Sequence, residues 1–342
     1  MSNTVLACAD EHALRRRDAV RNRVTLGLVA GGMFMAVLDT TIVNVALPAL
    51  RASLGAAVSG LAWIVDAYTL TFAALILAGG VASDRFGAKT VYLAGLAVFV
   101  AASTACGLAS SVGALVVARF AQGAGAALFL PASLAIVRAT FEDAQERARA
   151  IATWALVASA AAAIGPVVGG LLIDSFGWRS AFLVNVPTGA VAFAGALVVV
   201  RQAARSSAVR RFDWGGQLSS AAALAALCFA AIELPTRGPR SPEVVAASLL
   251  LAVCVAALIF FERRSPEPMV PLAWFRNRIF SAMNAAGTLA YVGYFGLLFN
   301  LSLYLHGALG MNAKATGFAL LPMAASLSFG NLLSGKLHAR IG

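Results

Sequence analysis

Runs of about 20 apolar residues recur ten times along this 342-residue chain. A helix of roughly 20 apolar residues is long enough to cross the ~30 Å hydrocarbon core of a bilayer. The runs therefore predict an all-α membrane protein of about ten transmembrane helices, a helical bundle. The predicted spans are Val24–Leu47, Leu61–Val81, Thr90–Ala109, Gly113–Val137, Ala148–Ile173, Ala181–Val200, Gln217–Leu234, Val244–Phe261, Ile279–Leu305 and Ala315–Leu337.

The composition excludes a cytosolic enzyme, a disordered tail protein and a secreted disulfide scaffold. Hydrophobic residues make up 60% of the chain and charged residues only 12%, whereas soluble domains are about 25% charged. The four cysteines have no CxxC spacing, and three of them lie in apolar runs where a thiol usually acts as a small hydrophobe. We therefore expect neither a disulfide nor a metal site.

The positive charge is arranged along the chain as in an oriented membrane protein. The net charge is +11, which in a soluble protein would suggest a nucleic-acid partner. Here the basic residues are concentrated in alternate connections: with the N-terminus inside, 20 of the 26 Lys and Arg residues fall on the inner side and five on the outer side. This asymmetry predicts a multi-pass plasma (inner) membrane protein with both termini in the cytoplasm and no nucleic-acid partner. Residues 1–23 are expected to form a cytoplasmic lead.

The connection after the second span carries a specific motif, Gly80-Val-Ala-Ser-Asp-Arg-Phe-Gly-Ala-Lys89. A glycine there permits a tight turn, and an acidic side chain beside basic ones can form a charged clasp at the cytoplasmic face. The motif resembles the GxxxDRxGxK signature between helices two and three of the major facilitator superfamily. The residues that match the inner-loop motif are Gly80, Asp84, Arg85, Gly87 and Lys89.

The end of the chain repeats part of this pattern. The segment Gly335–Gly342 again places Gly…Arg-x-Gly after an apolar run, with Ala339 where the first copy has its aspartate. Such repetition is typical of a transporter built from two related halves. The clasp is expected to be weaker in this second copy.

Two further segments resemble one branch of that superfamily, the fourteen-helix drug/proton antiporters: Leu38–Pro48 matches its LDxTxVNVALP pattern and Trp178–Pro187 its WRxxFxxNxP pattern. Two others match patterns of the superfamily as a whole: Arg119–Gly125 matches RxxQGxG, and Gly165–Gly170 is similar to the antiporter motif. The resemblance implies proton-coupled export of small molecules, with the proton gradient as energy source and no bound cofactor.

The resemblance also implies a division of the chain. Residues 24–200 correspond to a six-helix N-terminal half, residues 201–262 to a linker with two extra helices, and residues 263–342 to the start of the C-terminal half. Because the branch has fourteen helices, four C-terminal helices are expected to be missing from this chain.

Three charged residues, Asp39, Asp66 and Arg119, fall inside predicted spans. Charges in a bilayer cost about 2.5–3.5 kcal/mol on insertion scales, so those that persist usually face a cavity or a partner. All three lie at one depth, about 8–9 Å from the outer boundary by the 1.5 Å rise per residue. This permits a cluster in which Arg119 neutralises one carboxylate and the other carries a proton; we favour Asp39 as the carrier because it lies within the branch's motif. In the alternative, Asp39 and Arg119 form a structural pair and Asp66 reaches to the outer interface.

The antiporter motif in the fifth span also has a packing interpretation. Small residues four apart let helices approach closely, and proline allows a kink. Gly165, Pro166, Gly169 and Gly170 could therefore seal the outer half of the protein while a cavity faces inward.

Candidate substrate contacts are polar residues in the N-terminal half and aromatic residues in the ninth span, namely Asn44, Gln122, Tyr291, Tyr294 and Phe295. Aromatic side chains suit flat, lipophilic or cationic compounds. The alternative is that these aromatic side chains face lipid.

The function favoured by these features is secondary active efflux of lipophilic or cationic small molecules in exchange for protons. No Walker loop is present, which argues against ATP as the energy source. Two alternatives remain: an uptake permease for a small nutrient, and a polytopic membrane enzyme. The enzyme is disfavoured because His12, His306 and His338 are each isolated from any catalytic cluster.

Overall fold

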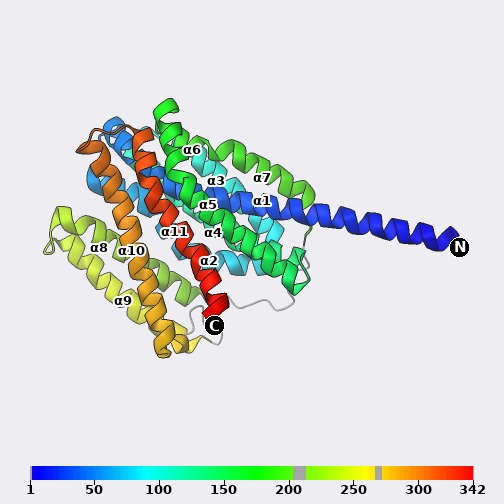
Figure 1. Cartoon of the computed structure of the whole chain (residues 1–342). Coiled ribbons are helices and arrows are strands. Elements are labelled where there is room, and N and C mark those ends of the chain that lie inside the picture. The colour runs from blue at the N-terminus through cyan, green and yellow to red at the C-terminus, as the bar shows by residue number, and fades with distance from the viewer. Residues whose placement is uncertain (1, 203–212, 266–271, 342) are drawn as a thin grey trace.

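The protein, analysed as a computed structural model, is a bundle of long helices, and the structure describes residues 2–202, 213–265 and 272–341 (Figure 1). Within these ranges it contains helices and no strand. The helices are α1 (Ser2–Leu54), α2 (Val58–Phe86), α3 (Ala88–Leu108), α4 (Val112–Thr140), α5 (Ala144–Phe176), α6 (Ser180–Leu183), α7 (Asn185–Val199), α8 (Trp214–Arg237), α9 (Pro242–Arg264), η1 (Leu272–Arg276), α10 (Arg278–Gly307) and α11 (Ala313–Ile341).

The predicted fold class is confirmed. Nine helical segments of the described chain are long and apolar enough to cross a membrane, and α11 lies at the tenth predicted span. The sixth predicted span is divided between the short helix α6 and α7. Helix α1 begins far ahead of its predicted span, and its first turns project beyond the rest of the bundle (Figure 1).

Polar side chains define where several helices begin. Ser111 accepts a hydrogen bond from the backbone of Ala114 at 3.2 Å at the start of α4. Asp143 and Ser241 cap α5 and α9 in the same way. These caps satisfy backbone N–H groups that have no partner within the helix, so the connections predicted from hydropathy coincide with local stop and start signals.

The connections lie at two ends of the bundle. At one end Lys89 Nζ donates to the Leu197 carbonyl at 2.7 Å, and at the other end Arg179 Nη2 donates to the Ala109 carbonyl at 3.3 Å. We name these the Gly87 end and the Gly177 end, after one connecting glycine at each. The basic residues predict that the Gly87 end faces the cytoplasm.

Glycines bring the helices of the first half close together. A Cβ added at Gly79 on α2 would collide with the carbonyl oxygen of Ala127 on α4. A Cβ on Gly125 of α4 would lie 2.6 Å from the backbone nitrogen of Phe99 on α3. Close backbone approach through small residues is a common way to pack membrane helices, and it positions α4 against both α2 and α3.

Helices α8 and α9 form a pair that docks on α2. Trp63 Nε1 donates to Glu233 Oε1 at 3.2 Å, and the Gln217 side chain donates to the Ala74 carbonyl. The rings of Trp63 and Phe229 lie 6.2 Å apart. The pair is therefore attached to the first half through polar contacts at two levels of α2.

Helix α10 contacts α1 mainly towards the Gly177 end. Ser302 Oγ on α10 donates to the Asn44 carbonyl on α1 at 2.6 Å. Towards the Gly87 end, by contrast, α10 exposes large apolar side chains: Ile279, Met283 and Leu289 are 72%, 70% and 72% exposed. The packing of α10 against the first half thus weakens from one end of the bundle to the other.

Candidate functional site

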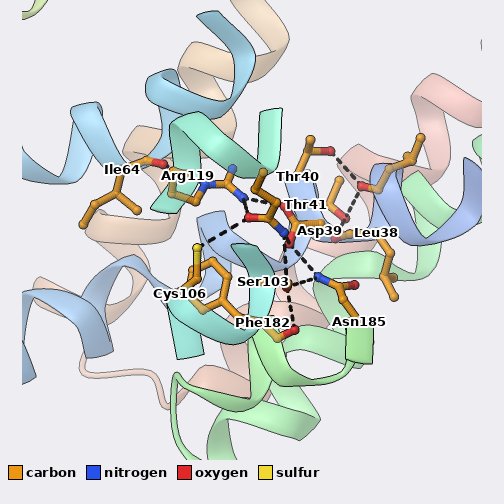
Figure 2. Close-up of polar contacts among 12 residues, drawn as sticks. Leu38, Asp39, Thr40, Thr41, Ile64, Ser103, Cys106, Arg119, Phe182 and Asn185 are labelled. Atoms are coloured by element: carbon orange, nitrogen blue, oxygen red, sulfur yellow. Dashed lines mark hydrogen bonds and ion pairs between the residues drawn. The ribbon is translucent and has the colours of Figure 1, made fainter. Parts of the chain in front are cut away.

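Asp39, in the second half of α1, lies at the centre of a buried polar cluster (Figure 2). Its Oδ2 accepts a hydrogen bond from Arg119 Nη1 at 2.5 Å, and its Oδ1 accepts from Gln122 Nε2 and from Asn185 Nδ2, both at 2.8 Å. Asp39 is 0% and Arg119 1% exposed. Charge-assisted hydrogen bonds of this kind are the strong ones, so three donors from α4 and α7 hold the carboxylate.

Arg119 joins three helices because of the spacing within α4. Its Nε donates to the Ile64 carbonyl on α2 at 3.0 Å, and its Nη1 also donates to Gln122 Oε1 at 2.8 Å. The guanidinium carbon lies 4.4 Å from the centre of the Tyr68 ring. Residues three apart share a helix face, while the bare Cα of Gly123 lets α4 approach the Tyr68 backbone.

Ser103 on α3 completes the cluster. Its Oγ accepts from Gln122 Nε2 at 3.2 Å and from Asn185 Nδ2 at 3.0 Å, and donates to the Phe182 carbonyl on α6 at 2.8 Å. Cys106 Sγ, one turn later on α3, lies 3.6 Å from Gln122 Oε1. Ser103 and Asn185 were not among the predicted site residues. The signal for Asn185 was its place in the WRxxFxxNxP pattern, whereas Ser103 had no signal beyond being a polar residue in an apolar run.

Asp66 does not join this cluster, although it lies at the depth expected. Ile64 and Tyr68 on the same helix face the cluster and are buried. Asp66 is halfway between them in sequence, so its side chain is rotated by roughly 200° from that of Ile64. It is half-buried, and the described residues offer it no ion pair. The expected cluster of two carboxylates and one guanidinium is therefore corrected to one carboxylate and one guanidinium.

The inner-loop motif is mostly helical. Gly80, Asp84 and Arg85 belong to the last two turns of α2, and only Gly87 lies between helices. Gly87 has a φ of +91°, and a Cβ there would collide with the Gln202 side chain. Glycine is therefore required at this turn.

The expected charged clasp of this motif is absent among the described side chains. Lys89 instead donates to a carbonyl near the end of α7, and Arg85 lies over the Phe86 ring at 5.5 Å. Asp84 is exposed and has no ion pair within the described part of the chain. In the second copy, the side chains of Gly335–Gly342 lie outside the described residues, and the backbone is helical to Ile341.

The antiporter motif packs α5 between α1 and α11. On one side a Cβ at Gly165 would collide with Thr41 Oγ1, and a Cβ at Gly169 would lie 3.2 Å from the Ile42 Cα.

On the other side a Cβ at Gly170 would lie 2.5 Å from the Ala313 carbonyl oxygen, and a Cβ at Gly317 would collide with the Pro166 carbonyl. All four motif residues are buried. They allow three backbones to meet in the half of the bundle nearer the Gly177 end.

The five candidate substrate residues do not form one group. Gln122 is fully buried in the Asp39 cluster, and Asn44 is 2% exposed with its Nδ2 donating to the Thr40 carbonyl at 2.8 Å. Tyr291 and Phe295 on α10 are stacked 6.2 Å apart and are 53% and 43% exposed.

Tyr294 is half-buried, and its ring meets that of Phe295 edge-on at 5.2 Å. Tyr294 also packs against the buried core, whereas Tyr291 and Phe295 are exposed. Two of the candidates thus belong to the packed interior, whereas the aromatic three lie along α10. In the described part of the chain, no three His, Cys, Asp or Glu side chains are placed to hold a metal ion.

Comparison with known proteins identifies the family. The family model described as Major Facilitator Superfamily matches residues 29–342. The chain is 41% identical over 313 residues to the methylenomycin A resistance protein of Bacillus subtilis (strain 168), covering 92% of this chain and 67% of that protein. It is 39% identical over 319 residues to the multidrug resistance protein Stp of Mycobacterium tuberculosis (strain CDC 1551 / Oshkosh), covering 93% of this chain and 59% of that protein.

The fold has solved counterparts. A crystal structure of a peptide transporter POT in complex with sulfate aligns with 91% of this chain and 69% of its own, with a TM-score of 0.57 and 15% identity. At this identity the likeness concerns the fold alone. With the family match over nearly the whole chain and relatives around 40% identical, this chain belongs to the Major Facilitator Superfamily.

Proposed function

We propose that this protein is a drug efflux transporter that exports lipophilic or cationic small molecules in exchange for protons. Its relatives are named as methylenomycin A, tetracenomycin C and lincomycin resistance proteins and as multidrug resistance proteins. Since the chain spans 59–68% of the length of these proteins, their activity is a proposal for this chain.

The observation that carries the proposal is the fully buried Asp39 carboxylate, held by Arg119, Gln122 and Asn185. A polar cluster of this kind inside a membrane bundle is costly and usually marks a proton or substrate pathway. Asp39 is the proposed proton-coupling group. Arg119 is the counter-ion of this carboxylate, and its guanidinium contacts α2 as well, so a movement of α2 or α4 would change the surroundings of Asp39.

The second element of the proposal is the place of substrate entry. With the Gly87 end in the cytoplasm, the glycine contacts of α5 with α1 and α11 lie on the outer side. There they close the outside, while α10 presents Tyr291 and Phe295 nearer the middle of the bundle. These rings would bind a flat cation by stacking and cation–π contact.

The test is transport in everted membrane vesicles whose interior is acidified by respiration. Addition of ethidium, a lipophilic cation, is expected to raise the interior pH. In an everted vesicle an exporter moves ethidium inward, and in exchange protons leave the interior. Asp39→Asn keeps the size of the side chain and removes the titratable group, so we expect it to abolish this response. An uptake permease would give no rise of interior pH.

The matched control is Asp174→Asn, which makes the same chemical change at an exposed position near the end of α5. It should retain the ethidium response. A response of equal size in Asp39→Asn, in vesicles containing equal amounts of protein, would refute the assignment of Asp39.

A further inference from the structure

Asn185 begins α7, directly after the break that separates this helix from α6. Its Nδ2 donates both to Asp39 Oδ1 at 2.8 Å and to Ser103 Oγ at 3.0 Å. The residue is 1% exposed, and its Oδ1 is buried with no hydrogen-bond partner among the described residues. A buried acceptor without a partner is uncommon and calls for an explanation.

The Ser103 hydroxyl has one hydrogen, and it donates this hydrogen to a carbonyl of α6. The hydroxyl receives two N–H groups, from Gln122 and Asn185, and donates to the carbonyl of Phe182 in α6. Phe182 is fully buried, and its ring meets that of Trp178 edge-on at 6.3 Å. A continuous polar path therefore leads from Asp39 through Asn185 and Ser103 to the short helix α6 at the Gly177 end.

The path responds to a proton on Asp39. The ionised carboxylate prefers N–H donors, which is the arrangement observed. A protonated Oδ1 becomes a donor and needs an acceptor. Rotation of the Asn185 amide by half a turn brings its spare Oδ1 to the place of Nδ2, within hydrogen-bond distance of both Asp39 Oδ1 and Ser103 Oγ.

In that rotated state Asn185 Oδ1 accepts from protonated Asp39 and attracts the hydroxyl hydrogen of Ser103. Ser103 then turns away from the Phe182 carbonyl. The rotation also leaves the Asn185 amide hydrogens without their former partners, so it is favourable only while the proton is present. No covalent bond changes apart from the O–H bond formed on Asp39.

We propose that Asn185 and Ser103 are positioning residues that couple proton uptake on Asp39 to the placement of helix α6. This proposal rests on the proposed role of Asp39 in proton coupling. It adds a consequence for the structure: protonation of Asp39 breaks the hydrogen bond from Ser103 on α3 to the Phe182 carbonyl on α6. This bond lies next to the glycine contacts that join α5 to α1 and α11.

Few other ionisable groups surround this path. Arg119 on α4, Tyr68 on α2 and Cys106 on α3 lie around Asp39 and interact with it electrostatically. Helix α7 contains no charged residue, and α5 and α10 carry theirs near their ends. Beside α6, the Arg179 guanidinium carbon lies 4.4 Å from the Trp178 ring centre.

The experiment uses the whole chain labelled with 5-fluorotryptophan, in nanodiscs. The chain has five tryptophans, and Trp178→Phe identifies the fluorine resonance of Trp178. The infrared band of the protonated carboxyl, assigned as the band missing in Asp39→Asn, follows the titration of Asp39. We expect the Trp178 resonance to shift with the same pH midpoint as this band.

Two variants interrupt the path. In Ser103→Ala and in Asn185→Ala the Asp39 band should still titrate, whereas the shift of the Trp178 resonance with that midpoint should be lost. Either variant suffices if the other does not fold, as judged by the four remaining fluorine resonances. Thr104→Ala, a matched change at the next residue of α3, and Asp174→Asn should keep the shift.

The two proposals fail in different ways. A Trp178 resonance that still follows Asp39 in Ser103→Ala and Asn185→Ala, or that ignores pH while the Asp39 band titrates, overturns the relay alone. If no carboxyl band is lost in Asp39→Asn at any pH, Asp39 takes up no proton, and both the relay and the proton-coupling role are overturned.

Discussion

At the scale of single residues, the candidate site depends on matching one buried cation to one buried anion. Arg119 and Asp39 are almost inaccessible, and each makes further hydrogen bonds beside the ion pair. Ion pairs in a low-dielectric interior repay their desolvation only with such geometry. The pair therefore contributes little net stability, but breaking it leaves an uncompensated charge.

This imbalance gives a prediction for Arg119→Gln. Removing one partner of a buried pair destabilises by about 3–5 kcal/mol, so we expect a strongly lowered unfolding midpoint in detergent. The double variant Arg119→Gln/Asp39→Asn removes both charges and should recover most of that loss. Thermal unfolding of both variants can be monitored by the loss of the size-exclusion peak after heating. A double variant as unstable as the single one would contradict the charge argument.

At the scale of helices, glycine positions decide which pairs pack closely. Gly79 and Gly80 are neighbours on α2, yet only Gly79 faces the α4 backbone, whereas a Cβ on Gly80 would meet nothing within 4 Å. The same distinction places Gly165 against α1 and Gly170 against α11 on successive faces of α5. A glycine-rich run therefore has separate roles for its members.

Alanine substitution separates these roles. Gly79→Ala places a methyl group against the Ala127 carbonyl, so α2 and α4 must move apart, and overpacking of this kind costs about 1–3 kcal/mol. Gly80→Ala adds a methyl group in open space and improves helix propensity by up to about 1 kcal/mol. Unfolding midpoints of the two variants are expected to change in opposite directions; equal losses would show that the contact with α4 is not the cause.

At the scale of the whole molecule, α10 and α11 join the other helices through specific contacts towards the Gly177 end. Contacts from α10 and α11 to the first half include Ser302 with Asn44 and Gly317 with Pro166, all towards the Gly177 end. The α8–α9 pair attaches separately to α2. Whether these contacts could close the outer or the inner side during transport depends on which end of the bundle faces the cytoplasm.

Cysteine labelling tests that orientation. Arg51→Cys and Asp174→Cys place thiols at exposed positions of the Gly177 end, and Glu142→Cys places one at the Gly87 end. With a membrane-impermeant maleimide on intact cells, we expect labelling of the first two and none of the third, with the unsubstituted chain as background. In everted vesicles the pattern should reverse, and labelling of Glu142→Cys in intact cells would invert the topology.

The sequence by itself determined the elements and the family. Transfer of a segment into a bilayer depends on its own residues, so windows of about 20 residues located the helices without knowledge of their neighbours. The same local argument indicated that Asp39 and Arg119 need an interior partner. The motifs, which are also local, indicated the superfamily that the comparisons then showed.

Only the tertiary structure decided how the helices are rotated about their axes. Depth follows from residue number, but the direction of a side chain depends on the packing of every neighbouring helix. That rotation turned Asp66 away from Arg119, split the candidate substrate residues between the interior and α10, and brought Ser103 and Asn185 to Asp39. These three outcomes depend on contacts between residues far apart in the chain, so no local pattern could have specified which side chains meet.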